Sequence, residues 1–420
     1  MEIKGKYTNA TIHTQMIEEE AIEQIKALCD QPFAEGSRIE IMPDVHAGKG
    51  CTIGTTMSID PVNGKVCPNL VGVDIGCGMN VTMLGKIDID FEKLDNTIRT
   101  FIPAGHDVHD ISGPKGAELY EWIGKMHEET RKGVLRYLCE LNTPINTTYE
   151  IQRLGTLGGG NHFIEIDKAE DGQCFLVIHS GSRHLGIEIC SHFMEIANAG
   201  QIGSLEYHRQ ERLAMIEQMK EAGRHREIPD AIKEFDSRFK PAEPSSLAYV
   251  EGDNLHKYLN DMKLAQWYAS DSRNLMADII CKAMSWNVIG RWETVHNYID
   301  MEDYILRKGA IRLDDRQIAI IPISMRDGAF IVKGKGNPEW NYSGPHGAGR
   351  VLSRSQARST LSLEQYKTSM EGIWTTSVNL DTIDESPAAY RKAEDILNVI
   401  SPTAEIISHV LPVYSFKAGN

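Results

Sequence analysis

The amino-acid sequence predicts an α+β fold in one large domain that carries a helical insertion. Segments with the 3.6-residue period of amphipathic helices alternate with short apolar runs rich in β-branched residues. We find no internal repeat and no Pro- or Ser-rich linker that would mark a joint between domains. We therefore expect a single domain over residues 1–420, with a helical insertion at residues 200–262.

The composition is that of a folded protein without a polycationic surface. Apolar residues make up 41% of the chain and charged residues 25%, which excludes wholesale disorder. The formal net charge of −15 argues against a protein that coats nucleic acid through bulk positive charge. The sequence has no long uncharged apolar run and no apolar N-terminal stretch, so we expect neither a membrane span nor a signal peptide. Eight scattered cysteines without a Cys-x-x-Cys pair favour a cytoplasmic location.

Helices and strands can be predicted in order along the first half of the chain. Ile17, Ala21, Ile25 and Leu28 recur on one face of an amphipathic helix. The other predicted elements in this half are a strand at 38–42, a strand–loop–strand segment at 62–84, a helix at 115–141 and a buried strand at 174–179.

Residues 187–290 are expected to be mainly helical, whereas the last third returns to strands. The heavily charged segment at 205–240 is typical of a protruding helical hairpin, and its charges indicate a solvated face rather than a binding site. Further strands are expected at 311–313, 318–322, 329–333 and 410–417. We expect Asp314-Asp315 to be the hairpin turn in this region.

Glycines cluster in four loops that also hold polar side chains. These loops lie at 72–78, 155–162, 179–183 and 346–350. Glycine allows the backbone to approach a ligand closely, and such loops can cradle phosphates with backbone N–H groups. None of the four matches the P-loop, the dinucleotide-binding fingerprint or the nucleophile elbow of serine hydrolases.

Five side chains in or beside these loops form a mixed donor set: Asp74, Cys77, His162, His179 and His296. Taken one by one, such residues are more often buried or structural than ligands, but their shared placement in loops supports a site. Five donors exceed the needs of one tetrahedral zinc ion, whereas two ions that share the thiolate would use them all. The donor types suit Mn, Zn, Co or Fe rather than Mg or Ca.

The remaining histidines and cysteines carry less information. His46 and His184 are intermediate cases, and the histidines that lie outside glycine-rich loops are interpreted as structural or surface residues. Cys51 and Cys67 lie near the donor set in sequence, but we expect them to be buried thiols.

Longer motifs run through nearly the whole chain. They are MPDVHAGKGCTIG at 42–54, VGVDIGCGMN at 71–80, LGTLGGGNHFIEI at 154–166, VIHSGSR at 177–183, HNYI at 296–299, RKGAI at 307–311, FIVKGKGN at 330–337, HGAGRVLSR at 346–354, IDESPAAY at 383–390 and a lysine just before the C-terminus. Together, and in this order, they resemble the RtcB family of RNA-splicing ligases. The resemblance implies an RtcB-like domain with central β-sheets flanked by helices.

The resemblance also implies a chemistry. RtcB ligases use GTP and Mn²⁺ to join RNA that ends in a 2′,3′-cyclic phosphate or 3′-phosphate to RNA with a 5′-hydroxyl end, in RNA repair or tRNA splicing. By this resemblance, His346 would attack the α-phosphate of GTP and become guanylylated. The guanylyl group would pass to the RNA 3′-phosphate, and the 5′-hydroxyl would then displace GMP. The five donors named above match the ligands of two manganese ions.

Other positions match the family residue by residue. The positions that match nucleotide contacts are Asn161, Phe163, Ile164, Glu165, His296, Asn297, Pro322, Ile323, Ser324, Met325, Ala329, Gly347, Ala348, Gly349, Tyr390 and Lys417. Tyr390 would stack on the guanine, and Arg183 and Asn297 would hold the RNA phosphate.

Three departures from the family pattern suggest a divergent branch. Ala329 lacks a hydroxyl where many members have serine, His184 stands where glycine is common, and the chain continues beyond Lys417. Two other functions stay open: a metal-dependent phosphoesterase that opens cyclic phosphates on RNA ends without ligation, and a binding protein with a degenerate pocket. A hydrolase would not need His346 or Lys417, and a binding protein would not need the full donor set, so the sequence favours the ligase.

Overall fold

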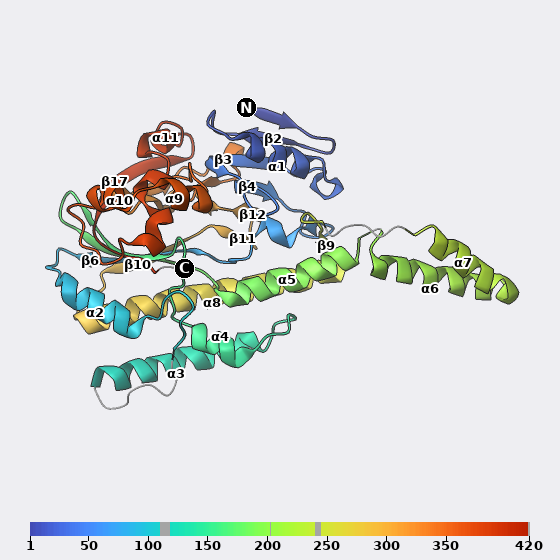
Figure 1. The fold of residues 1–420 in the computed structure, drawn as a ribbon, viewed down its shortest axis with the longest axis horizontal. Helices are drawn as coiled ribbons and strands as arrows, with labels where there is room; N and C mark the ends of the chain where they lie inside the picture. The colour runs from blue at the N-terminus through green and yellow to red at the C-terminus, as the bar shows by residue number, and fades with distance from the viewer. Residues whose placement is uncertain (110–117, 202, 240–244, 419–420) are drawn as a thin grey trace.

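The computed structural model describes residues 1–109, 118–201, 203–239 and 245–418 (Figure 1). It confirms the α+β class, since two large β-sheets pack with helices around a common core. In the described parts of the chain, no helix is both long enough and apolar enough to cross a membrane.

The first sheet has six strands and is built mainly from the N-terminal part of the chain. Its order is β1 (Glu2–Lys4), β2 (Asn9–Ile12), β3 (Ile39–His46), β4 (Ile53–Ser58), β12 (Ile305–Lys308) and β11 (Asn297–Ile299). Neighbouring strands are antiparallel except for β2 and β3, which run parallel.

The second sheet has seven strands and is antiparallel throughout. Its order is β10 (Gly290–Val295), β6 (Gly78–Gly85), β8 (Cys174–Ser180), β7 (Phe163–Ala169), β17 (Ala404–Phe416), β15 (Gly328–Gly334) and β14 (Ile318–Ser324). The sheet curls, because Ile320 N on one edge strand donates to Thr294 Oγ1 on the other edge strand at 3.2 Å. One face is buried in a small apolar cluster inside the curl. The other face is buried in the main core along β7 and β8 and in a separate apolar cluster along β14 and β15.

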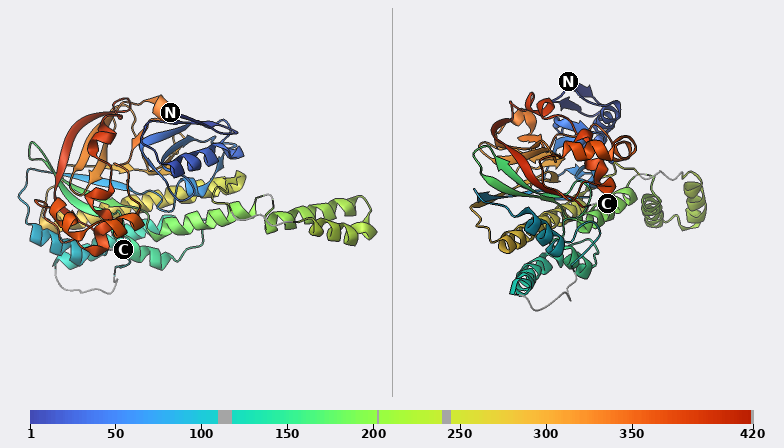
Figure 2. Two further views of the ribbon diagram at one scale, coloured as in Figure 1. Left: turned by 45° about the horizontal axis from the view of Figure 1, so that its top comes forward. Right: turned by 60° about the vertical axis from the view of Figure 1, so that its left-hand side comes forward.

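Helices cover the main core. The long helix α8 (Gly252–Met284) contacts β6 and β8, with three further helices packed beside it (Figures 1 and 2). These are α2 (Phe91–Phe101), α3 (Glu118–Leu138) and α5 (His184–Ala199). The remaining helices are α1 (Glu19–Cys29), α4 (Thr147–Arg153), α6 (Leu205–Glu221), α7 (Ile228–Ser237), α9 (Arg354–Thr360), α10 (Leu363–Ser369) and α11 (Ala393–Leu397).

Most predicted elements are confirmed. The predicted helix around Ile17–Leu28 is α1. The strand predicted at 174–179 lies within β8, and those predicted at 38–42 and 410–417 overlap β3 and β17 in all but one residue each. The segment 62–84 holds β5 (Lys65–Val66), a short 3₁₀ turn and β6. The helix predicted at 115–141 corresponds to α3, although residues 115–117 lie outside the described residues.

The hairpin predicted at Asp314-Asp315 is wrong. β13 (Ala310–Arg312) does not pair with β14, and its partner is β16 (Ser343–Pro345), about 30 residues further along the chain. The hairpin in this region joins β14 to β15 through residues 325–327. The turn residues at 314–315 suggested that β13 pairs with β14. Pairing between strands that are distant in sequence has no comparable local signal, so the pair of β13 with β16 could not be predicted.

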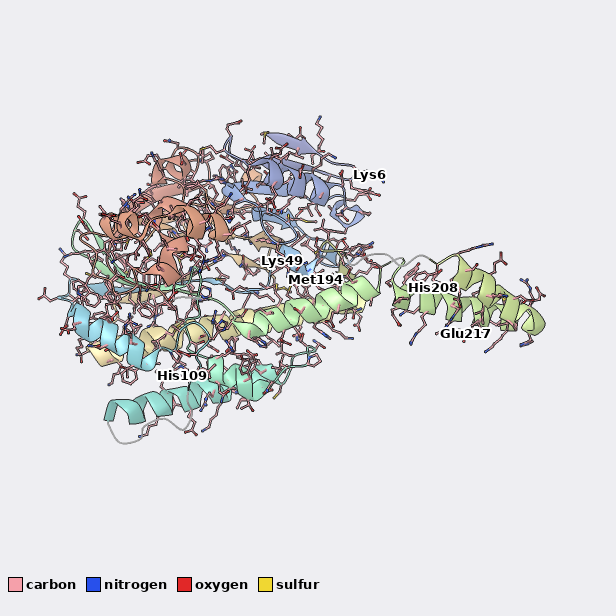
Figure 3. The ribbon with its side chains drawn as sticks, viewed as in Figure 1. Lys6, Lys49, His109, Met194, His208 and Glu217 are labelled. Carbon is pink, nitrogen blue, oxygen red and sulfur yellow. The ribbon has the colours of Figure 1, made fainter. Side chains whose placement is uncertain are left out.

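The charged segment forms an arm that stands away from the body. α6 and α7 pack against each other beyond the end of α5, and His208 and Glu217 lie on this arm (Figure 3). The His208 ring stacks on Phe235 and Phe239 at centroid distances of 4.7 and 3.9 Å. Both helices are fully described, and Met219 is the one residue in them that is buried.

The two ends of the arm lie close together at the body. Ser245 N donates to Asn198 Oδ1 at 2.7 Å, and Asn198 Nδ2 donates back to Ser245 O at 3.4 Å. The predicted range 200–262 also includes the first turns of α8, where Leu255, Tyr258 and Leu259 are buried in the main core. We propose that the insertion ends before α8.

Replacing residues 201–243 with a short Gly-Ser linker is expected to leave the body folded. The arm buries little surface, and the bonded pair Asn198 and Ser245 shows that a short linker spans the gap. The melting temperature should stay within about 5 °C of that of the full chain, measured by circular dichroism. A non-cooperative transition in the shortened protein would contradict the proposal.

Candidate functional site

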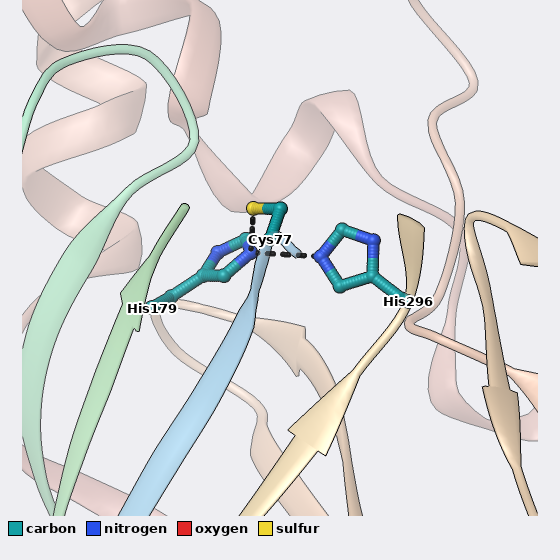
Figure 4. Close-up of side chains that lie close together, drawn as sticks. All are labelled: Cys77, His179 and His296. Carbon is teal, nitrogen blue, oxygen red and sulfur yellow. Dashed lines mark hydrogen bonds between the residues drawn. The ribbon is translucent and has the colours of Figure 1, made fainter. Parts of the chain in front are cut away.

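The five predicted donors meet where neighbouring strands end. Cys77 directly precedes β6, His179 lies near the end of β8, and His296 lies between β10 and β11. Met79 is the register partner of His179, so the ends of these strands lie at the same edge of the sheet. The side chains of the three residues converge there (Figure 4).

The donor atoms lie within contact distance of one another. Cys77 Sγ is 3.4 Å from His162 Nε2 and 3.3 Å from His179 Nε2. His179 Nε2 is 3.1 Å from His296 Nε2, and His162 Nε2 is 3.0 Å from Asp74 Oδ2. The donors form two groups that could each hold a metal ion, Cys77–His179–His296 and Asp74–Cys77–His162. Cys77 belongs to both groups.

Each imidazole is anchored through its other nitrogen. Nδ1 of His162 lies 2.9 Å from the Leu157 carbonyl oxygen, and Nδ1 of His179 lies 3.1 Å from the Asn161 carbonyl oxygen. Nδ1 of His296 lies 3.3 Å from Asn297 Oδ1. These acceptors place the ring proton on Nδ1, which leaves the Nε2 lone pairs directed at the cluster, as in metal-ligating histidines.

The electrostatics of the cluster fit a cation. Burial lowers the pKa of His179 and His296 well below the usual range, so both rings are neutral, as metal-binding imidazoles must be. Burial and the neighbouring Asp74 raise the pKa of the Cys77 thiol, and a bound metal would reverse this and favour the thiolate. Asp74 Oδ1 is buried and has no hydrogen-bond partner among the described residues. The donor set therefore fits a borderline-soft divalent metal.

Glycines leave room for the side chains around the cluster. A Cβ atom on Gly181 would lie 2.1 Å from Asp74 Oδ1, and one on Gly158 would lie 2.0 Å from the Arg183 guanidinium. Side chains at either position would displace the carboxylate or the guanidinium, so the close approach explains both glycines.

A cavity of about 320 Å³ opens on one side of the cluster. Its walls contain twelve of the predicted nucleotide-contacting residues, namely Asn161, Phe163, Glu165, Pro322, Ile323, Ser324, Met325, Gly347, Ala348, Gly349, Tyr390 and Lys417. The other predicted residues lie elsewhere. Ile164 belongs to the main core, Ala329 belongs to the apolar cluster inside the curl, and His296 and Asn297 lie on the metal side.

His346 lies between the metal cluster and this cavity. Its ring centroid is 4.7 Å from that of His296, and the residue lines the cavity. The Asp44 carboxylate lies 2.6 Å from His346 Nδ1 and also accepts the His346 backbone N–H at 3.0 Å. Asp44 is fully buried. The carboxylate therefore fixes the ring orientation with the proton on Nδ1, which leaves the lone pair on Nε2.

A second cavity, of about 460 Å³, is lined by Asp74, His162 and Arg183. Arg183 adopts a positive φ of 58°, which is strained for a residue with a side chain. Its Nη1 lies 3.2 Å from His162 Nδ1, so a cationic group borders the metal cluster here. Asn297 lines neither cavity, because its side chain binds the backbone of Asp74 and Gly309.

Sequence reasoning missed several residues of the site. Asp44 lies inside a quoted motif but received no role, and its burial within an apolar strand was the available signal. His46, Arg350 and Arg354 also line the 320 Å³ cavity. Cys51 and Cys67 are buried, as expected, and burial raises the pKa of Cys67 to about 12.

A buried cluster of N, O and S donors between two cavities is the arrangement of a metal-binding enzyme. Residues 24–418 match the family model described as tRNA-splicing ligase RtcB. The RNA-splicing ligase RtcB of Escherichia coli K12 is 31% identical over 96% of this chain and 95% of its own length. The tRNA-splicing ligases RtcB of Archaeoglobus fulgidus and Thermococcus kodakarensis are 25% and 22% identical, over 92% and 98% of this chain and 88% and 94% of their own lengths. The chain belongs to the RtcB family.

Cys77→Ala is expected to remove metal from both groups, because Cys77 is the donor that they share. The affinity for metal should fall by more than the roughly 10- to 100-fold that is typical when a residue hydrogen-bonded to a metal ligand is lost. Cys51→Ala is a matched control, since Cys51 is equally buried and lies outside both groups. Metal content after manganese loading and dialysis, measured by mass spectrometry, should fall only for Cys77→Ala. Equal content in the two variants would contradict the metal assignment.

Proposed function

We propose that the protein is a GTP- and Mn²⁺-dependent RNA ligase that joins 2′,3′-cyclic phosphate or 3′-phosphate ends to 5′-hydroxyl ends. Its family and the names of its relatives support an RNA ligase. The observation that carries the finer proposal is the position of His346, which faces the nucleotide-sized cavity and contacts the edge of the donor cluster.

The residues of the two cavities have distinct roles in this proposal. GTP occupies the 320 Å³ cavity, where Phe163, Tyr390 and Lys417 surround the base and the loop 347–349 lies beside the phosphates. The RNA end occupies the 460 Å³ cavity, where the Arg183 guanidinium binds its phosphate. When bound at Asp74, Cys77, His162, His179 and His296, manganese ions would neutralise charge on the phosphoryl oxygens.

The proposed reaction is a chain of phosphoryl transfers. His346 Nε2 attacks the α-phosphorus of GTP, a P–N bond forms, and pyrophosphate leaves. The positive charge that develops on the ring is stabilised by Asp44, which accepts the Nδ1 proton in a hydrogen bond. Water opens the RNA cyclic phosphate to a 3′-phosphate, whose oxygen then attacks the guanylyl phosphorus and releases His346. Finally, the 5′-hydroxyl attacks the activated 3′-phosphate, a phosphodiester bond forms, and GMP leaves.

His346→Ala is expected to take no label from α-labelled GTP and to fail to join a 3′-phosphate RNA to a 5′-hydroxyl RNA. The variant should still join an RNA prepared with a 3′-pp-5′-G end, because that substrate bypasses the histidine step. Its metal content should match that of the wild type, since the five donors are unchanged. Self-labelling by the variant would refute the nucleophile role, and a wild type that opens cyclic phosphates without taking label would indicate a phosphoesterase.

Asp44→Asn tests the charge beside the nucleophile. Oδ2 of Asp44 accepts both from Nδ1 and from the backbone N–H of His346, so the amide oxygen of asparagine keeps that place, and the change removes the negative charge that stabilises the cationic ring. We expect self-guanylylation to slow by about 100-fold or more, measured as the rate of label incorporation at saturating GTP. Joining of the RNA that already carries the 3′-pp-5′-G end should change little, because that step no longer needs His346. An equal loss in both steps would assign Asp44 a general structural role.

A further inference from the structure

A buried carboxylate outside the predicted site connects four side chains of the nucleotide-sized cavity. Glu385 ends a 3₁₀ segment at Leu380–Glu385 and is 2% exposed. Its Oε2 atom accepts from Lys417 Nζ at 2.8 Å and from the Tyr390 hydroxyl at 2.6 Å. Its Oε1 atom accepts from Arg354 at 2.7 Å and from Arg350 at 3.2 Å.

All four partners line the cavity, whereas Glu385 itself does not. Each carboxylate oxygen can accept about two hydrogen bonds, so the four partners use the full capacity of this group. Glu385 is therefore not free to bind a nucleotide directly. Any effect that it has on a ligand must pass through Lys417, Tyr390, Arg350 or Arg354.

The charges of this network favour an anionic ligand. Asp384, the preceding residue, pairs with Arg354 at 2.7 Å and with Arg358 at 3.0 Å. Two carboxylates thus face four cations, Arg350, Arg354, Arg358 and Lys417. Burial alone would raise the pKa of Glu385, but Lys417 and Arg354 lower this pKa to about 2. The carboxylate stays ionised, and an excess of positive charge remains beside the cavity.

We propose that Glu385 is a positioning residue for the nucleotide, which holds Lys417 and Tyr390 in their binding arrangement before the nucleotide arrives. This inference rests on the proposed function, because it assumes that the 320 Å³ cavity binds GTP. A free lysine side chain has a flexible four-carbon stem with many accessible rotamers, and it loses this freedom when it is held in one place. A lysine already held by a buried carboxylate loses less of this freedom when a ligand binds.

Tyr390 is held in a similar way. Its hydroxyl is bound to Glu385, and the Arg350 guanidinium lies over its ring at 5.0 Å from the centroid. Both contacts fix the plane of the ring, and the ring can then stack on a base without reordering. Without the charge of Glu385, the three cations Lys417, Arg350 and Arg354 would repel one another across the cavity wall.

The test compares two isosteric changes in adjacent residues of the full chain loaded with manganese. Glu385→Gln removes the charge that orders Lys417 and Tyr390. Asp384→Asn is the matched control, because Asp384 is equally buried and also pairs with Arg354 but contacts neither Lys417 nor Tyr390. The measurement is the rate of self-guanylylation as a function of GTP concentration, together with the melting temperature of each variant.

Glu385→Gln should raise the half-saturating GTP concentration by about tenfold or more and lower the maximal rate less. Asp384→Asn should keep this concentration within about twofold of the wild-type value, although both variants lose stability. In the background of Lys417→Met, the further change Glu385→Gln should have much less effect than it has alone, because the two residues act together. If Glu385 has only a structural role, the effects of Glu385→Gln and Lys417→Met should add, and the half-saturating GTP concentration should not change.

The outcomes separate this inference from the ligase proposal. If the wild type takes no label from GTP, both are overturned. If the wild type takes label and Glu385→Gln has wild-type half-saturation, or its effect adds fully to that of Lys417→Met, only the inference is overturned. Should Glu385→Gln fail to fold, Tyr390→Phe removes one bond to Glu385 and keeps the ring. That variant should raise half-saturation severalfold, and a wild-type value would overturn the inference.

Discussion

Five side chains with metal-donor atoms meet at one edge of a curled sheet, four of them buried, and the rest of the site depends on this constraint. The Cys77 thiol and the neutral imidazoles of His179 and His296 gain nothing from facing one another without a cation, and a buried carboxylate oxygen without a partner is costly. The fold nevertheless fixes each ring through its far nitrogen. The anchoring contacts and the glycines beside them are explained if the cluster must be ready for metal before metal binds.

The cluster also separates the space around it into two cavities. Asn161 lines both of them, and the donors His179 and His162 line one each. His346 is the residue that the proposed reaction requires to meet both substrates. It lines one cavity, and its ring packs 4.7 Å from that of His296, a member of the cluster. Asp44 fixes the orientation of the ring from the side opposite the reaction.

The sequence was informative where chemistry is carried by unusual residue types in glycine-rich loops. The five donors and His346 could be named from motifs, and the structure brings the donors together. It was least informative for buried acids. Asp44 and Glu385 both lie inside quoted motifs. An apolar run around Asp44 suggests burial, but residue type alone does not distinguish a carboxylate that orders its neighbours from one that faces solvent. The β13–β16 pair was missed for a related reason, because its partners are joined by packing rather than by a turn.

A chain with a formal charge of −15 must still accommodate nucleotide and RNA phosphates if it is a ligase. The distribution of charge explains how this can be achieved without a basic surface. Arg183 borders one cavity, and among the described residues no carboxylate forms an ion pair with it. Around the other cavity, the cations outnumber the carboxylates that hold them. A low-dielectric environment strengthens the attraction between each cation and a phosphate, so a few ordered cations suffice to bind phosphates. The order of the cations around the 320 Å³ cavity depends on the buried acids that hold them in place.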